Sequence, residues 1–396
     1  MTLPLAPTIA GTQAPPVMEA RRWLQGVEHS AERPLVNVSQ AAPVAPPPEG
    51  LRQAMAEAVL TQDSAHLYGP VLGLPSLRDA LATQMTTHYC ATITADQVAI
   101  TSGCNMAFTA AMATLAQTGD EVILPLPWYF NHAMWLDMAG VKAVPLDTGQ
   151  DLLPDPEAAE ALITNRTRAI VLVTPNNPAG VEYPAGLLDQ FRDLCRRKGL
   201  ALVIDETYRD FHSVGGAPHG LFQDPDWDDT VIHLYSFSKA YRLTGHRVGA
   251  LVSSPARLAE VEKYLDTVAI CPAQPGQIGA HWGIENLGDW LAAERQEILA
   301  RRAAVEAAMP IMPHWRLLGA GAYFAYLEHP FDMASDTLAQ ALVEEAGVLL
   351  LPGTFFRPAG DPKARREVRV AFANIDSAQI KTLAERLAAL PFPLAA

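Results

Sequence analysis

Residues 231–253 read VIHLYSFSKAYRLTGHRVGALVS, in which two apolar runs flank a polar segment, and this stretch decides the fold. The runs Val231–Tyr235 and Val248–Ser253 have the length and composition of buried strands. From about residue 98 onward, similar runs alternate with longer amphipathic stretches, which is the pattern of βα units. The other strands that this pattern predicts are Val98–Thr101, Glu121–Leu126, Ala169–Thr174 and Ala201–Asp205. We therefore expect an α/β fold with a mostly parallel central sheet in a large domain.

The chain has 396 residues, more than one hydrophobic core usually serves, so we expect two domains. Three prolines at positions 46–48 forbid regular helix and predict an extended N-terminal arm over residues 1–50, which we assign to the smaller domain. The large domain is expected over 51–285. Beyond a long helix at Leu287–Ala308, short strands and helices alternate, which predicts a compact α+β domain over 286–396. Its expected strands are Gly321–Leu327, Val348–Leu351 and Val368–Phe372.

The composition limits the classes of function. A formal net charge of −14 opposes binding to nucleic acid or to an anionic membrane, yet it permits a local basic pocket for one anionic ligand. No stretch of about 18 apolar residues is present, and the N-terminus lacks the pattern of a signal peptide. The four cysteines have neither metal-ligand spacing nor a disulfide pattern. We expect a soluble cytoplasmic enzyme without a metal site.

The strongest chemical motif is Ser236-Phe237-Ser238-Lys239, which follows a predicted strand and precedes Arg247 by eight residues. A lysine just past a buried strand and beside other cations loses its proton easily, so its neutral amine can form a Schiff base with an aldehyde. Arg247 and the two serines are suited to bind a phosphate. Taken alone, the motif also fits a surface lysine in a polar loop.

A second motif, Asp205-Glu206-Thr207-Tyr208, ends another predicted strand. A buried aspartate without a partner is costly. Asp205 therefore either caps the following segment or pairs with a protonated pyridine nitrogen, which keeps such a ring an electron sink. Tyr208 either bonds the phenolate oxygen of that ring or is packed in the core.

Two further turns follow predicted strands. Residues 174–180, TPNNPAG, contain Asn and Pro, which by themselves indicate only a turn. Residues 101–105, TSGCN, join a strand to an apolar helix, so the backbone N–H groups there form either an anion site or an ordinary helix cap. Cys104 has no assignable His or Asn partner, and we do not expect it to be a nucleophile.

The order and spacing of these four motifs resemble the fold-type I transferases that depend on pyridoxal 5′-phosphate (PLP), specifically the class I/II aminotransferase family. That family, which includes aspartate, aromatic and alanine aminotransferases, has an Asn-Pro-x-Gly turn, an Asp-x-x-Tyr strand end, a Ser-x-Ser-Lys segment and an arginine eight residues past the lysine. The resemblance covers nearly the whole chain. It implies an enzyme that moves an amino group between an L-amino acid and a 2-oxo acid with ping-pong kinetics.

The resemblance also implies a role for each matching residue. Lys239 would hold PLP as a Schiff base and shuttle the proton between substrate Cα and cofactor C4′. Asp205 would contact the pyridine nitrogen, while Asn177 and Tyr208 would bond the phenolate oxygen, with Asn177 also at the substrate. The implied phosphate ligands are Ser236, Ser238, Arg247 and the backbone groups of Gly103, Cys104 and Asn105.

Other implied contacts involve the substrate and a second subunit. In PWYFNH at 127–132, the ring expected to stack on the pyridine falls on Tyr129, with Trp128 as the alternative. Arg369 resembles the arginine that clamps the substrate α-carboxylate, and Ala41 lies where the family often has a glycine that closes over the substrate. Tyr68 is similar to the tyrosine that reaches the phosphate of the neighbouring subunit, which implies a homodimer with shared active sites.

Substrate choice stays open at this point. Some members that act on acidic substrates carry a lysine where this chain has Cys104, so a dicarboxylate preference lacks that support. Trp128, Tyr129 and the apolar arm instead favour aromatic or aliphatic side chains. The alternative function is a PLP-dependent C–S (β) lyase or another PLP enzyme on the same fold, because cofactor residues do not fix which bond breaks.

Overall fold

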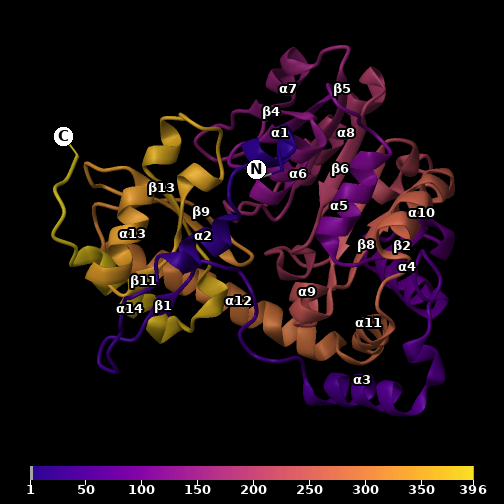
Figure 1. Ribbon diagram of the computed structural model, residues 1–396, viewed down its shortest axis with the longest axis horizontal. Helices are drawn as coiled ribbons and strands as arrows, with labels where there is room; N and C mark the ends of the chain where they lie inside the picture. The colour runs from indigo at the N-terminus through magenta and orange to yellow at the C-terminus, as the bar shows by residue number, and fades with distance from the viewer. Residues whose placement is uncertain (1–2, 396) are drawn as a thin grey trace.

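The computed structural model describes residues 3–395 and contains a large seven-stranded sheet (Figure 1). The strand order is β2-β8-β7-β6-β5-β3-β4, and every neighbouring pair is parallel except the two pairs that involve β8. The predicted α/β class and the mostly parallel sheet are thereby confirmed. The strands are β2 Val98–Thr101, β3 Glu121–Pro125, β4 Lys142–Leu146, β5 Thr167–Val173, β6 Ala201–Asp205, β7 Val231–Ser236 and β8 Gly249–Val252.

Helices cover both faces of this sheet, which explains why its central strands are apolar throughout. Alternate residues of β6 enter different cores: Leu202 and Ile204 pack in one cluster, Ala201 and Val203 in another. The helices around the sheet are α3 Glu49–Thr61, α4 Pro75–Tyr89, α5 Cys104–Ala113, α6 Phe130–Ala139, α7 Pro156–Leu162, α8 Ala185–Lys198, α9 Phe237–Ala240, α10 Pro255–Ala269 and α11 Gln274–Asn286.

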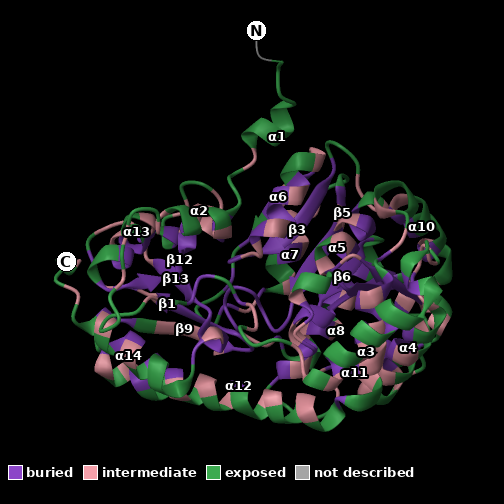
Figure 2. Cartoon of the chain, turned by 60° about the horizontal axis from the view of Figure 1, so that its bottom comes forward, coloured by how far each residue is buried: buried purple, intermediate pink, exposed green. Residues whose placement is uncertain are grey.

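A second, antiparallel sheet has the strand order β12-β13-β10-β9. Separately, the short strand β1, Val36–Asn37, pairs in parallel with β11, Val348–Leu349, so the N-terminal segment joins the C-terminal part of the chain. Figure 2 shows α12 running along the bottom of the molecule beneath both parts. The remaining elements here are β9 Arg316–Gly321, β10 Phe324–Glu328, β12 Leu351–Pro352, β13 Glu367–Val370, α12 Gly288–Ala308, α13 Ser335–Glu345 and α14 Ser377–Ala388. The domain limits 1–50, 51–285 and 286–396 stay a prediction.

Four features differ from the sequence-based expectation. The single strand predicted at Val348–Leu351 is instead divided between β11 and β12, which belong to different sheets. The arm is not extended throughout, because α1, Pro7–Gly11, and α2, Pro16–Arg22, are short helices; each begins with proline, which the first helical turn tolerates. Strand β4 was not expected, since it contains a proline, but it lies at the sheet edge where proline is allowed. The predicted strand Gly321–Leu327 is instead the turn between β9 and β10 followed by β10 itself.

The helices are exposed on their outer sides, while the buried residues concentrate in the sheets (Figure 2). Within residues 3–395, none of the helices has both the length and the apolar character needed to cross a membrane.

Candidate active site

A cavity of about 600 Å³ opens where the carboxyl ends of β5, β6 and β7 meet the N-terminus of α5. Strand ends of this kind are where ligands bind in open parallel sheets. The wall brings together residues from all four motifs with residues of the N-terminal arm and β13. The expected site residues in the wall are Ala41, Cys104, Asn105, Tyr129, Asn177, Asp205, Tyr208, Ser236, Ser238, Lys239, Arg247 and Arg369.

Lys239 lies on α9, immediately after β7, and points into this cavity. Its Nζ donates a hydrogen bond to the carbonyl oxygen of Ala41 at 2.5 Å. Burial, together with the positive charges of Arg369 and Arg247, lowers the pKa of Lys239 to about 7. A large fraction of this side chain is therefore the neutral, nucleophilic amine at physiological pH.

Asp205 ends β6, and its side chain is almost fully buried. Burial acts to raise the pKa of Asp205, but contacts to its carboxylate outweigh that effect, and the net pKa is lowered. His132 Nε2 lies 3.3 Å from Oδ2, and the backbone N–H of Thr207 donates to Oδ1 at 3.0 Å. Asp205 therefore stays a carboxylate, able to pair with a cation in the cavity.

His132 was missed by the sequence argument, although it stands in the quoted segment PWYFNH. It is buried on α6 and stacks on Phe108, with ring centroids 3.9 Å apart. The available signal was the buried carboxylate itself, because such a group requires a hydrogen-bonding partner. Nothing in the spacing identified which residue that partner would be.

The turn before α5 and Arg247 form a basic cradle. Gly103 has φ of 87°, and a Cβ placed on it would meet Arg247 Nη2 at 2.3 Å, so the guanidinium packs directly on the turn. Gly249 likewise lets β8 approach the N-terminus of α5, since its Cβ would lie 2.5 Å from the backbone nitrogen of Cys104. The helix N-terminus, Arg247 and the hydroxyls of Ser236 and Ser238 are donors suited to a phosphate.

Cys104 is held in its neutral thiol form. Burial and the adjacent carboxylate of Asp205, whose Oδ1 lies 3.8 Å from Sγ, raise the pKa of Cys104 well above its usual value. A protonated thiol is a poor nucleophile, in line with the expectation from sequence.

Arg369, on β13, is buried at one end of the cavity rather than exposed on its strand. Its Nη1 donates to Asn177 Oδ1 at 2.8 Å and its Nη2 to the carbonyl oxygen of Ser39, while Nε has no hydrogen-bond partner in the described part of the chain. Burial lowers the pKa of Arg369 to about 10, which leaves it a cation at neutral pH. A planar carboxylate would complement this charge and the free donor.

Tyr129 and Trp128, the two candidates for the ring that stacks on the pyridine, lie in different surroundings. Tyr129 lines the cavity, and its hydroxyl lies 3.3 Å from Asn105 Oδ1 and accepts from Asn131 Nδ2 at 2.8 Å. Trp128 packs against the core beside α5 and is not part of the cavity wall. Tyr208 faces the cavity, and burial raises its pKa well above the usual value, so it remains a neutral hydrogen-bonding group.

Two predicted site residues are not part of the cavity wall: Gly103, which lies directly beside it under Arg247, and Tyr68. Tyr68 is the distant one. It is 81% exposed and lies outside the cavity wall of its own chain. A role for Tyr68 in catalysis therefore depends on a second copy of the chain.

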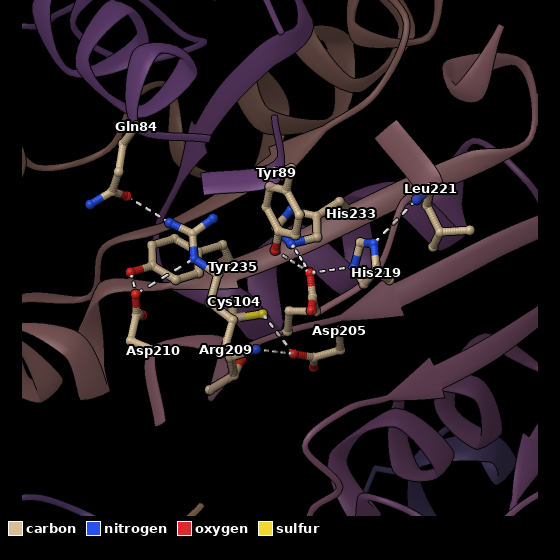
Figure 3. A network of polar contacts seen from close by, with 12 residues as sticks. Gln84, Tyr89, Cys104, Asp205, Arg209, Asp210, His219, Leu221, His233 and Tyr235 are labelled. Carbon is tan, nitrogen blue, oxygen red and sulfur yellow. Dashed lines mark hydrogen bonds and ion pairs between the residues drawn. The ribbon is translucent and has the colours of Figure 1, made fainter. Parts of the chain in front are cut away.

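Behind Asp205, a separate polar cluster surrounds Glu206. The Glu206 Oε2 atom accepts from Tyr89 at 2.5 Å and lies 3.2 Å from His219 Nε2 and 3.0 Å from His233 Nε2. Figure 3 shows Tyr89, His219 and His233 converging, apart from Asp205 and Cys104. Burial acts to raise the pKa of Glu206, but the two histidines outweigh it and the net pKa lies well below the usual value.

The residues of the cavity fit PLP group by group. The near-neutral amine of Lys239 matches an aldehyde, the carboxylate of Asp205 matches a pyridinium nitrogen, and the cradle around Gly103 and Arg247 matches a phosphate. Arg369 has a free donor and no acidic partner in the described residues, so it could pair with a further carboxylate.

Comparisons with known proteins agree with this chemistry. The family described as "Aminotransferase class I and II" matches residues 33–387. Aromatic aminotransferase ISS1 of Arabidopsis thaliana is 29% identical over 331 residues, covering 81% of this chain and 80% of the relative, and an aspartate aminotransferase of Pyrococcus horikoshii is 28% identical over 333 residues, 83% of each. A mutant aspartate aminotransferase of Thermus thermophilus, at 23% identity, shares the fold with a TM-score of 0.87 over 98% of this chain and 99% of that one. With its cavity and sequence pointing to the same chemistry, the chain belongs to the class I and II aminotransferases, enzymes that use PLP to move amino groups between amino acids and 2-oxo acids.

Proposed function

We propose that the cavity around Lys239 performs the amino transfer, with Lys239 as both the anchor of the cofactor and the carrier of the transferred proton. The observation that carries this proposal is the lowered pKa of Lys239, about 7, in a cavity that also holds Arg369 and Arg247. Bound PLP supplies an electron sink for the charge that remains when the substrate Cα loses its proton.

The other cofactor contacts follow from the donors and acceptors in the wall. Asp205 would hold the ring nitrogen in its protonated form, and Asn177 and Tyr208 would donate to the phenolate oxygen. Tyr129 would be the aromatic residue that contacts the ring, because it lines the cavity and Trp128 does not. The phosphate is bound by Ser236, Ser238, Arg247 and the backbone of Gly103, Cys104 and Asn105.

The substrate contacts are proposed for Arg369, Asn177 and the arm. Arg369 binds the α-carboxylate and so orients the Cα–H bond toward Lys239. The Nζ atom of Lys239 accepts this proton and later returns it, which a group with a pKa near neutrality does efficiently. Ala41 and the arm residues Pro16 and Met18 cover the cavity and limit the access of water.

We further propose a homodimer in which Tyr68 reaches the cavity of the partner. The dimer is supported by other exposed apolar residues of this region, including Leu60, Leu67 and Ile270, which a partner subunit would cover.

We also propose a location in the reducing cytoplasm. All four cysteines of the chain are free thiols, which supports this location.

An absorbance scan of the PLP-loaded protein tests the function directly. The panel includes phenylalanine, tyrosine, methionine, aspartate and glutamate, because the relatives are named for aromatic and aspartate transfer. We expect at least one amino acid to shift the cofactor absorbance without added oxo acid, and a 2-oxo acid to reverse the shift. Release of ammonia without any reversible shift would indicate a lyase and contradict the proposal.

A further inference from the structure

Three consecutive residues of the arm each contact a different basic side chain. The carbonyl oxygen of Ser39 accepts from Arg369 Nη2, the side chain of Gln40 accepts from Arg21 Nη2 at 2.7 Å, and the carbonyl oxygen of Ala41 accepts from Lys239 Nζ at 2.5 Å. Arg21 is therefore linked through three consecutive arm residues to the two groups that are proposed to bind and deprotonate the substrate. All three basic side chains belong to the wall of one cavity.

The helix that carries Arg21 is firmly placed. In α2, Ala20 is fully buried in a core cluster that includes Phe130 and Phe356, and Trp23, at the end of the helix, stacks on Phe355 with ring centroids 6.1 Å apart. The neighbouring Arg22 forms an ion pair with Glu19 at 2.6 Å and is not part of the cavity wall. Both arginines are exposed to solvent, but only Arg21 also lines the cavity, at its open side.

The charges in the cavity wall do not balance. The wall contains three arginines, Arg21, Arg247 and Arg369, beside the near-neutral amine of Lys239, and a single carboxylate, Asp205. In the proposed function, Arg247 binds the phosphate, Arg369 the α-carboxylate, and Lys239 carries the proton. Arg21 is left over, and among residues 3–395 it forms no ion pair with a carboxylate.

We propose that Arg21 binds the side-chain carboxylate of a dicarboxylic substrate, so that one amino donor or oxo-acid acceptor of this enzyme is dicarboxylic. A guanidinium fork matches a carboxylate in shape and charge, and Gln40 holds it in place until that substrate arrives. A neutral substrate leaves the Arg21–Gln40 contact intact and packs its side chain against Met18 and Phe130. The inference rests on the proposed function and adds the class of one substrate to it.

The test compares Arg21→Gln with the matched control Arg22→Gln, which removes a charge from the same helix outside the cavity. We expect Arg21→Gln to lower kcat/KM for glutamate about 10- to 100-fold, the usual loss for a hydrogen bond between charged groups, and to change that for phenylalanine less than about 3-fold. Arg21→Lys keeps the charge without the fork and should retain part of the glutamate activity. Arg22→Gln should leave both substrates within about 3-fold.

A binding measurement separates this inference from the proposed function. Titration calorimetry of the PLP-loaded protein with glutarate, an unreactive dicarboxylate, and with butyrate, its monocarboxylate counterpart, needs no turnover. Arg21→Gln should weaken glutarate binding about 10-fold or more and leave butyrate unchanged. Equal losses for glutamate and phenylalanine, or unchanged glutarate binding, would overturn the role of Arg21, whereas absence of turnover with normal glutarate discrimination would count against the proposed function alone.

Discussion

Asp205 and Glu206 are adjacent buried carboxylates at the end of β6, yet they serve opposite sides of the sheet. Asp205 continues the face of Ala201 and Val203 and opens into the cavity, whereas Glu206 follows the face of Leu202 and Ile204. Asp205 keeps room for a ligand beside its contacts with His132 and Thr207. The Oε2 atom of Glu206 instead contacts Tyr89 on α4, His233 on β7 and His219 in the loop before Leu221. The comparison teaches that strand alternation points one carboxylate of a dipeptide toward a ligand cavity and the next into a polar cluster on the other face of the sheet.

The largest difference between the two positions is expected in catalysis. Asp205→Asn keeps the shape of the side chain and its ability to accept from Thr207, but it cannot hold a cationic ring nitrogen. We expect kcat to fall about 10²- to 10³-fold, the usual cost of losing one preorganised electrostatic contact in an active site. Steady-state kinetics at saturating PLP would check this, and a loss below about 5-fold would contradict the assignment.

Glu206→Gln should show the reverse pattern. Three donors would face a neutral acceptor, so the free energy of unfolding should fall by about 1–3 kcal/mol, measured by urea denaturation. The value of kcat should change less than about 10-fold, because Glu206 does not line the cavity. A loss of activity as large as that of Asp205→Asn, with unchanged stability, would place both carboxylates in the site and break the comparison.

His132→Phe tests whether the contact with His132 keeps Asp205 ionised. The new ring keeps the stacking on Phe108 but removes the donor to Asp205, so the pKa of Asp205 should rise. We expect kcat/KM to fall about 10-fold at neutral pH and further on the acidic side, as the general effect of losing a supporting hydrogen bond. A pH–rate profile identical to that of the unmodified enzyme would show that His132 does not support Asp205.

The smallest expected effect concerns acid stability. The pKa of Glu206 is depressed in the folded state, so its contribution to stability is present above its unfolded value, about 4.5, and is lost as the pH falls below it. Glu206→Gln should therefore flatten the stability profile below pH 4.5 relative to the unmodified enzyme. Thermal unfolding at a series of pH values measures this slope, and equal slopes in the two proteins would argue against a charged Glu206.

The sequence predicted those features of the fold that depend on neighbouring residues alone. The strand Ala201–Asp205 and its two polar end groups follow from an apolar run that stops at a charged pair, and the match is to the residue. The sequence did not predict that β8 runs antiparallel to β7. A strand that is buried on both faces is apolar throughout in either direction, so its composition does not indicate its direction.

The contacts that complete the site were out of reach for a different reason. His132 meets Asp205 and Arg21 meets Gln40 only after the chain has folded, and neither pair has a spacing that periodicity could detect. Tyr68 was identified through family resemblance alone, since nothing within one chain brings it to the cavity. The motifs thus predicted residues that line one cavity, while the partners of these residues required the three-dimensional structure.

The most direct test of the central claim is a peptide map of the PLP-loaded enzyme after reduction with borohydride. If the near-neutral amine of Lys239 holds the cofactor, mass spectrometry will find the reduced PLP adduct on the peptide that contains Ser236-Phe237-Ser238-Lys239 and on no other lysine. An unmodified Lys239, with the adduct elsewhere or absent, would contradict the account.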